Sequence, residues 1–250
     1  MIPLDIAAIV WIAIAIAIFP IQFFVTAPYG RHARTDWGPS IPNRLGWFLM
    51  ELVSLVVFVG LFVFGPIEKT APVWIFFALW TGHYVNRSLI FPWRTRTQGK
   101  MMPVAIVGSA IAFNLVNASL NGLYLGWSGQ MYAPEWLTDP RFIVGLVVFG
   151  VGATVNIWSD NRLIGLRDGG RRDYSIPRGG LFEWVSCPNL LGEIIQWWGF
   201  ALMCWNLPAL SFAIWTTANL VPRAVSHHAW YGRTFDDYPP HRRAVIPGLL

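Results

Sequence analysis

The sequence predicts an all-α, polytopic integral membrane protein with seven transmembrane helices. Hydrophobic residues make up 55% of the 250 residues and charged residues only 12%, about half the charged fraction of ordinary soluble domains. Seven apolar segments approach the roughly 20 residues that a helix needs to cross the hydrocarbon core. The 15 Trp and 7 Tyr residues suit the two membrane interfaces, where amphipathic rings accumulate.

The first apolar segment, 5–25, has no basic region before it and no small-residue cleavage site after it, so we interpret it as a retained helix. The next four segments, 45–64, 72–92, 103–125 and 142–163, are apolar along their length. The last two, 189–206 and 208–228, are separated only by the hinge "NLP". No repeat or low-complexity linker divides the chain, so we expect a single membrane domain over residues 1–250.

Basic residues predict the orientation of these helices. Three or four Lys and Arg residues fall in each of 26–44, 93–102, 164–188 and the C-terminal tail, whereas the alternate loops hold only Lys69 and Arg141. Positive residues accumulate on the cytoplasmic side. We therefore expect the N-terminus outside and the C-terminus in the cytoplasm.

The formal charge of +5 does not indicate a nucleic-acid partner, because the basic residues are distributed among loops and form no single basic face. Cys187 and Cys204 lie in or beside apolar segments. Two such cysteines predict neither a disulfide framework nor a metal site.

Three polar stripes lie near the predicted cytoplasmic ends of the last three helices. Helical neighbours are three or four residues apart, and the first stripe joins Asn156 to Asp160, reaching Arg167 if that helix continues. The second joins Asn189 to Glu193. The third stripe consists of Arg223, His227 and Tyr231.

Ionisable groups inside a membrane are costly unless they pair or line a wet cavity. Carboxylates and amides suit ribose hydroxyls and a carboxamide, and Arg suits phosphate. The stripes therefore favour a phosphorylated nucleotide entering from the cytoplasm. The alternative is a set of interhelical hydrogen bonds together with Arg residues that contact lipid head groups.

Two further groups lie in earlier helices. Glu51 follows Trp47 by one turn, and Tyr84 lies near Arg87 on its own helix. A buried Glu can act as a neutral acid and a phenol can donate to a carbonyl oxygen, so the two would polarise a ketone if they met. Spacing alone leaves open that Glu51 pairs with Arg44 or with another helix.

Two glycine- or asparagine-rich motifs complete the pattern. "NLVNASLNGLYL" places Asn114, Asn117 and Asn121 near one helix face, where amides join helices or line a cofactor cavity. "PRGG" at 177–180 predicts a turn in which Gly tolerates unusual backbone angles. Neither motif names a ligand.

Several of these stretches resemble the steroid 5-alpha-reductase family. The resemblance is densest in "NIWSD", "YSIPRGGLFEWVSCPNLLGEIIQW" and "FDDYPPHRRAVIPGLL", which are similar to the family's C-terminal domain. Upstream, "WFLMEL", "GHYVNRSLIFP" and, more loosely, "NASLNGLYL" resemble its second, third and fourth helices.

The resemblance implies a seven-helix membrane enzyme that uses NADPH to saturate the 4,5 double bond of 3-oxo-4-ene steroids. Hydride would pass to the beta carbon while Glu51 and Tyr84 hold the 3-ketone, with Tyr84 the proton donor. Helices in 1–140 would form the substrate side and 141–250 the NADPH-binding part. The implied cofactor residues are Asn117, Asn156, Asp160, Arg167, Asn189, Glu193, Arg223, His227 and Tyr231.

Candidate phosphate contacts are Arg94, Arg96, Arg171 and Arg172. Arg94 and Arg96, together with Lys100, are considered because Ser109 stands where mammalian members of the family have a basic residue. Arg171 and Arg172 are considered because their loop adjoins the polar stripes. Met50 replaces a Gln before Glu51, and Ala118 replaces a Gly after Asn117. These departures affect the ketone site and part of the phosphate contact.

The expected partners are an apolar enone such as a steroid and the lipid bilayer, and we expect a monomer without bound metal. A membrane methyltransferase of the isoprenylcysteine type, which uses S-adenosylmethionine, has a related C-terminal architecture but gives Glu51 and Tyr84 no obvious role. A transporter or lipid-binding protein would consume no cofactor at all.

Overall fold

The computed structural model describes residues 3–97, 99–167 and 174–250. The chain divides into two compact units, each of which is described by itself. Unit 1 consists of Met1–Val10, Ala27–Ile143 and Asn206–Ser211, and unit 2 of Trp11–Thr26, Val144–Trp205 and Phe212–Leu250. The prediction of a single domain stays a prediction.

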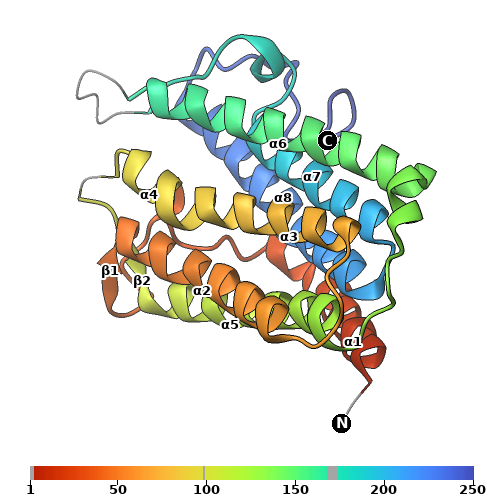
Figure 1. Ribbon diagram of the computed structural model, residues 1–250. Coiled ribbons are helices and arrows are strands. Elements are labelled where there is room, and N and C mark those ends of the chain that lie inside the picture. Colours follow the sequence, from red (N-terminus) through yellow and green to blue (C-terminus); the bar gives the residue numbers. More distant parts are fainter. Residues whose placement is uncertain (1–2, 98, 168–173) are drawn as a thin grey trace. The chain divides into compact units, whose positions relative to one another are not determined.

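The described chain is mostly helical, and helices occupy all seven of the predicted ranges (Figure 1). The long helices are α1 (Leu4–Ile18), α2 (Asn43–Phe64), α3 (Ala71–Val85), α5 (Val104–Leu123), α6 (Pro140–Gly165), α7 (Pro188–Cys204) and α8 (Leu207–Thr234). A π-helical turn, Asn86–Ile90, joins α3 to the short α4 (Phe91–Arg94), and another, Tyr124–Ser128, extends α5. Short 3-10 helices lie at Ile21–Phe23, Gly30–His32, Pro134–Thr138 and Gly180–Glu183.

Four helical segments of the described chain are long and apolar enough to cross a membrane. They are Leu4–Phe23, Asn43–Phe64, Val104–Ser128 and Pro140–Gly165. The protein is therefore a multi-pass membrane protein. The count of seven spans and the direction of the termini stay predictions.

In unit 1, a short antiparallel strand pair starts two helices side by side. β1 (Ser40–Pro42) pairs with β2 (Met101–Pro103), and α2 and α5 begin at the next residue of each strand. The two helices then run in the same direction, in contact where Gly122 of α5 meets Leu61 of α2. A side chain at Gly122 would have its Cβ only 2.9 Å from the Cβ of Leu61, which explains why glycine occupies this contact.

The helix α3 packs antiparallel to α2 through aromatic rings. Phe58 stacks on Trp80 with ring centroids 4.8 Å apart, and Phe62 stacks on Phe77 at 4.4 Å. Large rings at these positions bury much apolar area, which stabilises the pair. The α2–α3 register that follows from these contacts places the predicted ketone residues.

In unit 2, α6 and α7 approach so closely that only glycine fits between them. A Cβ at Gly152 would lie 2.3 Å from the backbone nitrogen of Gln196, and one at Gly192 would lie 2.4 Å from that of Asn156. Gly145 and Gly199 make the same kind of contact further along the two antiparallel helices. Small residues of this kind let membrane helices pack backbone to backbone.

The second half of the first helical segment packs on α8 through polar groups. The side-chain amide of Gln22 donates to Asn219 at 2.9 Å, and the Thr26 and Ser226 hydroxyls are 3.0 Å apart. The Trp215 indole also donates to the Trp11 carbonyl at 2.9 Å. These bonds connect segments about 200 residues apart in the chain.

Candidate functional site

The polar stripes of α6 and α7 meet in one hydrogen-bonded cluster. The Asn189 amide donates to Asp160 Oδ1 at 3.0 Å, and the Asn156 amide donates to the Asn189 carbonyl at 2.9 Å. The Asn156 Nδ2 also lies 3.4 Å from Glu193 Oε2. The structure therefore brings together the four residues that helical spacing had assigned to two separate faces.

The glycine contacts explain how this cluster forms. Because Gly192 has no side chain, the α7 backbone lies against Asn156, which can then reach the Asn189 carbonyl on the facing helix. Asn156 and Asp160 are buried, and Asn189 and Glu193 are partly exposed. The cluster thus combines two carboxylates with two side-chain amides, and the side of it formed by Asn189 and Glu193 is partly accessible.

Arg167 lies just beyond α6, since that helix ends at Gly165. The condition under which Arg167 would return to the Asn156 face, a helix that continues to this residue, is therefore not met. Instead, the Arg167 guanidinium lies over the ring of Tyr174 at 5.0 Å, and Tyr174 packs edge-on against Trp230 at 5.0 Å. Arg171 and Arg172 lie outside the described residues.

The third stripe, Arg223, His227 and Tyr231, lies on a continuous stretch of α8. Tyr231 is 2% exposed. Its ring stacks parallel on Tyr238 of the C-terminal segment, with centroids 5.2 Å apart and an interplanar angle of 6°. Tyr231 is thus held by residues that follow α8 in the chain.

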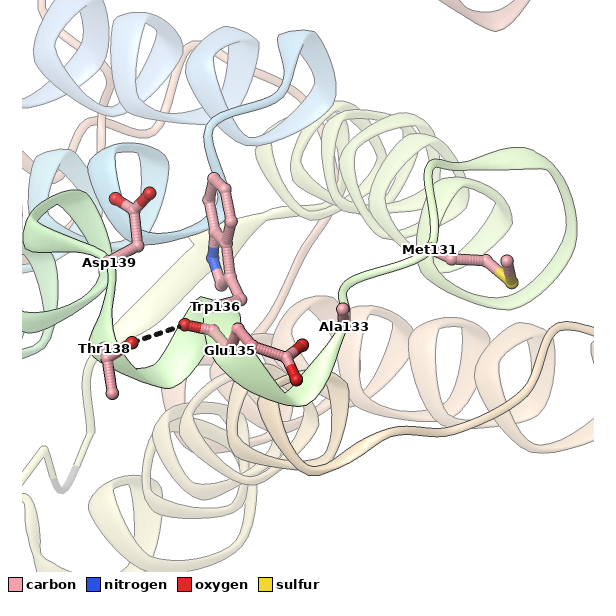
Figure 2. A pocket seen from close by; sticks show the side chains of 6 residues that line it. All are labelled: Met131, Ala133, Glu135, Trp136, Thr138 and Asp139. Carbon is pink, nitrogen blue, oxygen red and sulfur yellow. Dashed lines mark hydrogen bonds between the residues drawn. The ribbon is translucent and has the colours of Figure 1, made fainter.

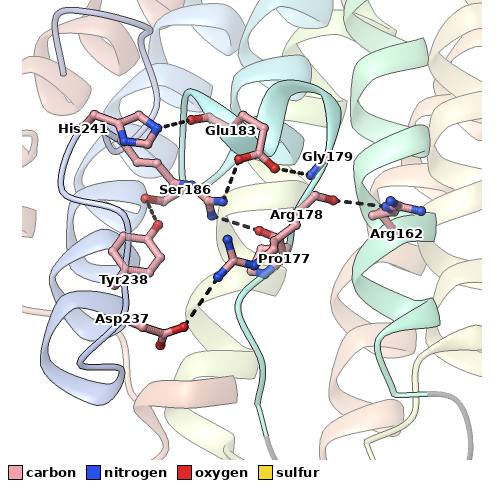
Figure 3. Close-up of polar contacts among 10 residues, drawn as sticks. Arg162, Pro177, Arg178, Gly179, Glu183, Ser186, Asp237, Tyr238 and His241 are labelled. Atoms are coloured by element: carbon pink, nitrogen blue, oxygen red, sulfur yellow. Dashed lines mark hydrogen bonds and ion pairs between the residues drawn. The ribbon is translucent and has the colours of Figure 1, made fainter.

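The "PRGG" motif forms the predicted turn, and the C-terminal segment fixes it (Figure 3). Gly179 and Gly180 adopt φ values of 91° and 56°, which side-chain-bearing residues rarely adopt. The Glu183 carboxylate accepts the backbone N–H of Gly179. The fully buried Arg242 donates to the Pro177 carbonyl at 2.9 Å and to Glu183 Oε2 at 3.3 Å.

The sequence analysis did not predict the ion pair of Glu183 with Arg242 beside this turn. The N–H of Gly179 and the cations of Arg242 and Arg178 hold the pKa of Glu183 below its ordinary value. Glu183 and Arg242 are 59 residues apart in the chain, so helical spacing could not connect them. The only signal was that both lie in stretches that carry the family resemblance.

In unit 1, Glu51 and Tyr84 lie at the same level of two antiparallel helices. Trp47, one turn before Glu51, has the Arg87 guanidinium 5.1 Å from its ring. Further along α2, after Glu51, Phe58 stacks on Trp80, which lies one turn before Tyr84 on α3. The two contacts bracket Glu51 on α2 and Tyr84 on α3.

The surroundings of the two residues differ. Tyr84 is 3% exposed and packs against Trp80 at 5.3 Å, whereas Glu51 is partly exposed. Arg44, the alternative partner considered for Glu51, donates to the Pro92 carbonyl at 3.1 Å and lies over Trp93. Tyr84 thus occupies an aromatic environment beside a π-helical turn, a feature frequent at functional sites.

The three asparagines of α5 are buried and hydrogen-bonded. Asn114 donates to the Met50 carbonyl at 2.7 Å, and Asn121 lies 3.3 Å from the Pro208 carbonyl. These two join segments of unit 1, as expected for packing residues. Asn117 donates to Phe113 of its own helix at 2.8 Å. Arg94 and Arg96 lie exposed, at the end of α4 and just after it.

A separate pocket of about 410 Å³ lies between α5 and α6 in the chain, around Trp136 (Figure 2). Met131, Ala133, Glu135, Thr138 and Asp139 line it. Its carboxylate Asp139 binds Arg141 through two hydrogen bonds of 2.9 and 2.7 Å, and this Arg lowers the pKa of Asp139 to about 2. None of the residues predicted for the site lines this pocket, and its best-placed acid is already used by Arg141.

Comparison with known proteins agrees with the resemblance. The model of the family described as 3-oxo-5-alpha-steroid 4-dehydrogenase matches residues 100–250. A steroid 5-alpha-reductase of Gossypium hirsutum is 42% identical over 229 residues, covering 90% of this chain and 89% of its own. The human 3-oxo-5-alpha-steroid 4-dehydrogenase 1 is 39% identical over 242 residues, covering 95% and 92% of the two chains.

A helical membrane protein with a buried cluster of amides and carboxylates is consistent with an enzyme of apolar substrates. The matches make this specific: the chain belongs to the 3-oxo-5-alpha-steroid 4-dehydrogenase family. Members of this family are oxidoreductases that act on CH–CH groups. The match to this family argues against the methyltransferase and transporter alternatives.

Proposed function

We propose that the protein catalyses NADPH-dependent reduction of the 4,5 double bond of 3-oxo-4-ene steroids. The observation that carries this proposal is the hydrogen-bonded cluster of Asn156, Asp160, Asn189 and Glu193 in a chain of this family. Relatives at about 40% identity over most of the chain are named as steroid 5-alpha-reductases. Their names supply the substrate class.

The residues of unit 2 fit a dinucleotide in their chemistry. Asp160 and Glu193 offer acceptors for ribose hydroxyls, and the amides of Asn156 and Asn189 offer both donors and acceptors for a carboxamide. Arg167 and Arg223 add cations suited to phosphate oxygens. The cluster is partly exposed at Asn189 and Glu193, so a ligand can reach these two groups.

The assignment of the remaining cofactor residues follows the same reasoning. His227 and Tyr231 share a face of α8 with Arg223 and would bind the same molecule. Asn117 is the member of the α5 asparagine set that the family resemblance assigns to the cofactor, and its amide also donates to the Phe113 carbonyl of its own helix. Arg94, Arg96, Arg171 and Arg172 remain the candidate contacts of the 2′-phosphate.

Catalysis would depend on Glu51 and Tyr84. When bound, NADPH would supply the hydride for the beta carbon of the enone. The Tyr84 hydroxyl donates a hydrogen bond to the 3-ketone oxygen, and neutral Glu51 donates a second one. As negative charge develops on that oxygen, both bonds strengthen, which lowers the barrier in the manner of an oxyanion hole. Tyr84 then gives its proton to the developing enol.

The membrane arrangement completes the proposal. Seven helices cross the bilayer with the N-terminus outside, so the charged loops and the cofactor lie on the cytoplasmic side. The steroid enters from the lipid, in which it is soluble, while the nucleotide enters from water. The working unit is a monomer.

Purified protein in detergent tests the proposal. NADPH absorbance is followed with and without a 3-oxo-4-ene steroid, and the steroid product is identified by mass spectrometry. We expect NADPH consumption only when the enone is present, with a product two hydrogen atoms heavier. Binding of NADPH without turnover of any steroid enone would contradict the substrate assignment.

A further inference from the structure

Ser186 is the point where three separate segments of unit 2 are joined. Its side chain is buried, at 3% exposure, in the short segment between the "PRGG" turn and α7. Its Oγ lies 2.6 Å from His228 Nδ1 on α8. The same Oγ lies 2.6 Å from the Tyr238 hydroxyl in the C-terminal segment (Figure 3). It also donates to the Arg243 carbonyl at 3.1 Å.

These three contacts use the whole hydrogen-bonding capacity of a serine hydroxyl. The group has one proton and two acceptor lone pairs. A carbonyl oxygen can only accept, so the proton of Ser186 goes to Arg243, and the Tyr238 hydroxyl and the His228 Nδ1–H must both donate to Ser186. The arrangement therefore fixes the direction of each bond and the tautomer of His228.

Backbone bonds hold Ser186 itself in place. The Ser186 N–H donates to the Arg243 carbonyl at 2.8 Å, and the next N–H, of Cys187, donates to Ala244 at 3.1 Å. Arg243 in turn donates to the Trp184 carbonyl at 2.9 Å. These backbone bonds pair the C-terminal segment with the residues just before α7. They hold the backbone of Ser186 in place independently of its side-chain bonds to His228 and Tyr238.

Ser186 and two of its partners, Tyr238 and His228, adjoin residues of the proposed cofactor site. Tyr238 stacks on Tyr231, with an interplanar angle of 6°. His228 directly follows His227 on α8. Ser186 precedes Asn189 by three residues, and α7 begins between them at Pro188.

We propose that Ser186 is a positioning residue for the dinucleotide site: through His228 and Tyr238 it sets the α8 stripe in register with the start of α7. This inference rests on the proposed function, in which both helices bind NADPH. Ser186 contacts no reacting atom, so its loss weakens cofactor binding and leaves the chemical step nearly unchanged.

The test compares NADPH binding by wild type, Ser186→Ala and Tyr238→Phe, measured by titration of the full-length protein in detergent. Each variant removes one partner of the 2.6 Å bond, and Tyr238→Phe retains the ring that stacks on Tyr231. We expect the Kd for NADPH to rise about three- to tenfold in Tyr238→Phe, the range that one lost hydrogen bond corresponds to. The rise should be at least as large in Ser186→Ala, which loses all three bonds of the hydroxyl. The value of kcat at saturating NADPH should change by less than about twofold.

Ser226→Ala is the matched control. This serine lies on the same helix as His228, and its hydroxyl bonds to Thr26 of the first helical segment at 3.0 Å. Its loss should lower the melting temperature without changing the Kd for NADPH. The double variant Ser186→Ala, Tyr238→Phe should bind NADPH no more weakly than Ser186→Ala alone, because Ser186→Ala already breaks the bond that Tyr238→Phe removes.

The outcomes separate the inference from the proposed function. If wild type binds NADPH and Ser186→Ala binds it as tightly as Ser226→Ala does, the positioning role is wrong while the proposed function stands. The positioning role would also be contradicted if the increases in Kd of the two single variants multiplied in the double variant, because Ser186 and Tyr238 would then act separately. If wild type itself does not bind NADPH, both the proposed function and the inference fail.

Discussion

The α6–α7 contact can be tested by adding a single methyl group. In Gly152→Ala the new Cβ would lie 2.3 Å from the Gln196 nitrogen and 2.6 Å from the Gly192 carbonyl oxygen. Both are backbone atoms, so the contact cannot be relieved by a side-chain rotation. Ordinary contact distances of a Cβ begin near 3.4 Å, and the helices would have to separate by roughly 1 Å at this point, because packed interiors leave little free space.

A separation of this size reaches the proposed cofactor site. Asn156 lies one turn from Gly152, and its 2.9 Å bond to the Asn189 carbonyl would stretch beyond the usual hydrogen-bond range of about 3.2 Å. Overpacking costs about 1–3 kcal/mol, partly offset by the helix propensity of Ala, which exceeds that of Gly by up to about 1 kcal/mol. If the overpacking weakens the free energy of NADPH binding by about 1.4 kcal/mol, the affinity for NADPH drops about tenfold.

Gly150→Ala provides the comparison on the same helix. Nothing lies within 4 Å of a Cβ at Gly150, so this variant should retain wild-type NADPH affinity and melt at the same or a higher temperature. Thermal shift and NADPH titration of both variants in detergent make the measurement. A Gly152→Ala protein with the melting temperature and NADPH affinity of Gly150→Ala would refute the α6–α7 contact.

Three further predictions concern single side chains. Tyr84→Phe should lower kcat by about a hundredfold or more, as for loss of a general acid, while NADPH titration shows unchanged affinity; a matching loss of affinity would contradict a role confined to the ketone. Asp160→Asn should weaken NADPH binding more than steroid binding, because the Asn189 amide and a ribose hydroxyl both need an acceptor; the reverse order in ligand titrations would exclude the role. Because the folded-state pKa of Glu183 is lowered, its stabilising contribution is present at neutral pH and is lost as the pH falls below the ordinary glutamate range. The melting temperature of wild type should therefore fall more steeply with decreasing pH than that of Glu183→Gln. If the two melting temperatures fell in parallel, the Glu183 carboxylate would contribute nothing to stability.

The sequence predicted the features that depend on local periodicity. Apolar segments located all seven helices, and the spacing of Asn156 with Asp160 and of Asn189 with Glu193 identified two faces that do meet. The periodicity of apolar and polar residues is a property of one segment, so a single sequence can report it. The "PRGG" turn was predictable for the same reason, because glycine pairs mark unusual backbone angles.

Contacts between distant segments were not predictable in this way. The ion pair of Glu183 with Arg242 and the bond of Ser186 with Tyr238 join segments more than 50 residues apart. No periodic pattern encodes such a pairing. The position of Arg167 was not predictable either, because it lies in the loop after α6, which ends at Gly165.

The central claim is that this chain reduces a steroid enone with NADPH, holding the ketone with Glu51 and Tyr84. The most direct measurement is the rate of NADPH oxidation by purified protein with a 3-oxo-4-ene steroid, compared between wild type and Glu51→Leu at saturating NADPH. Because Leu cannot donate a hydrogen bond to the ketone, the account predicts turnover by wild type and a large loss of kcat in Glu51→Leu with NADPH affinity retained. Equal rates in the two proteins, or no steroid-dependent oxidation by a wild type that binds NADPH, would contradict it.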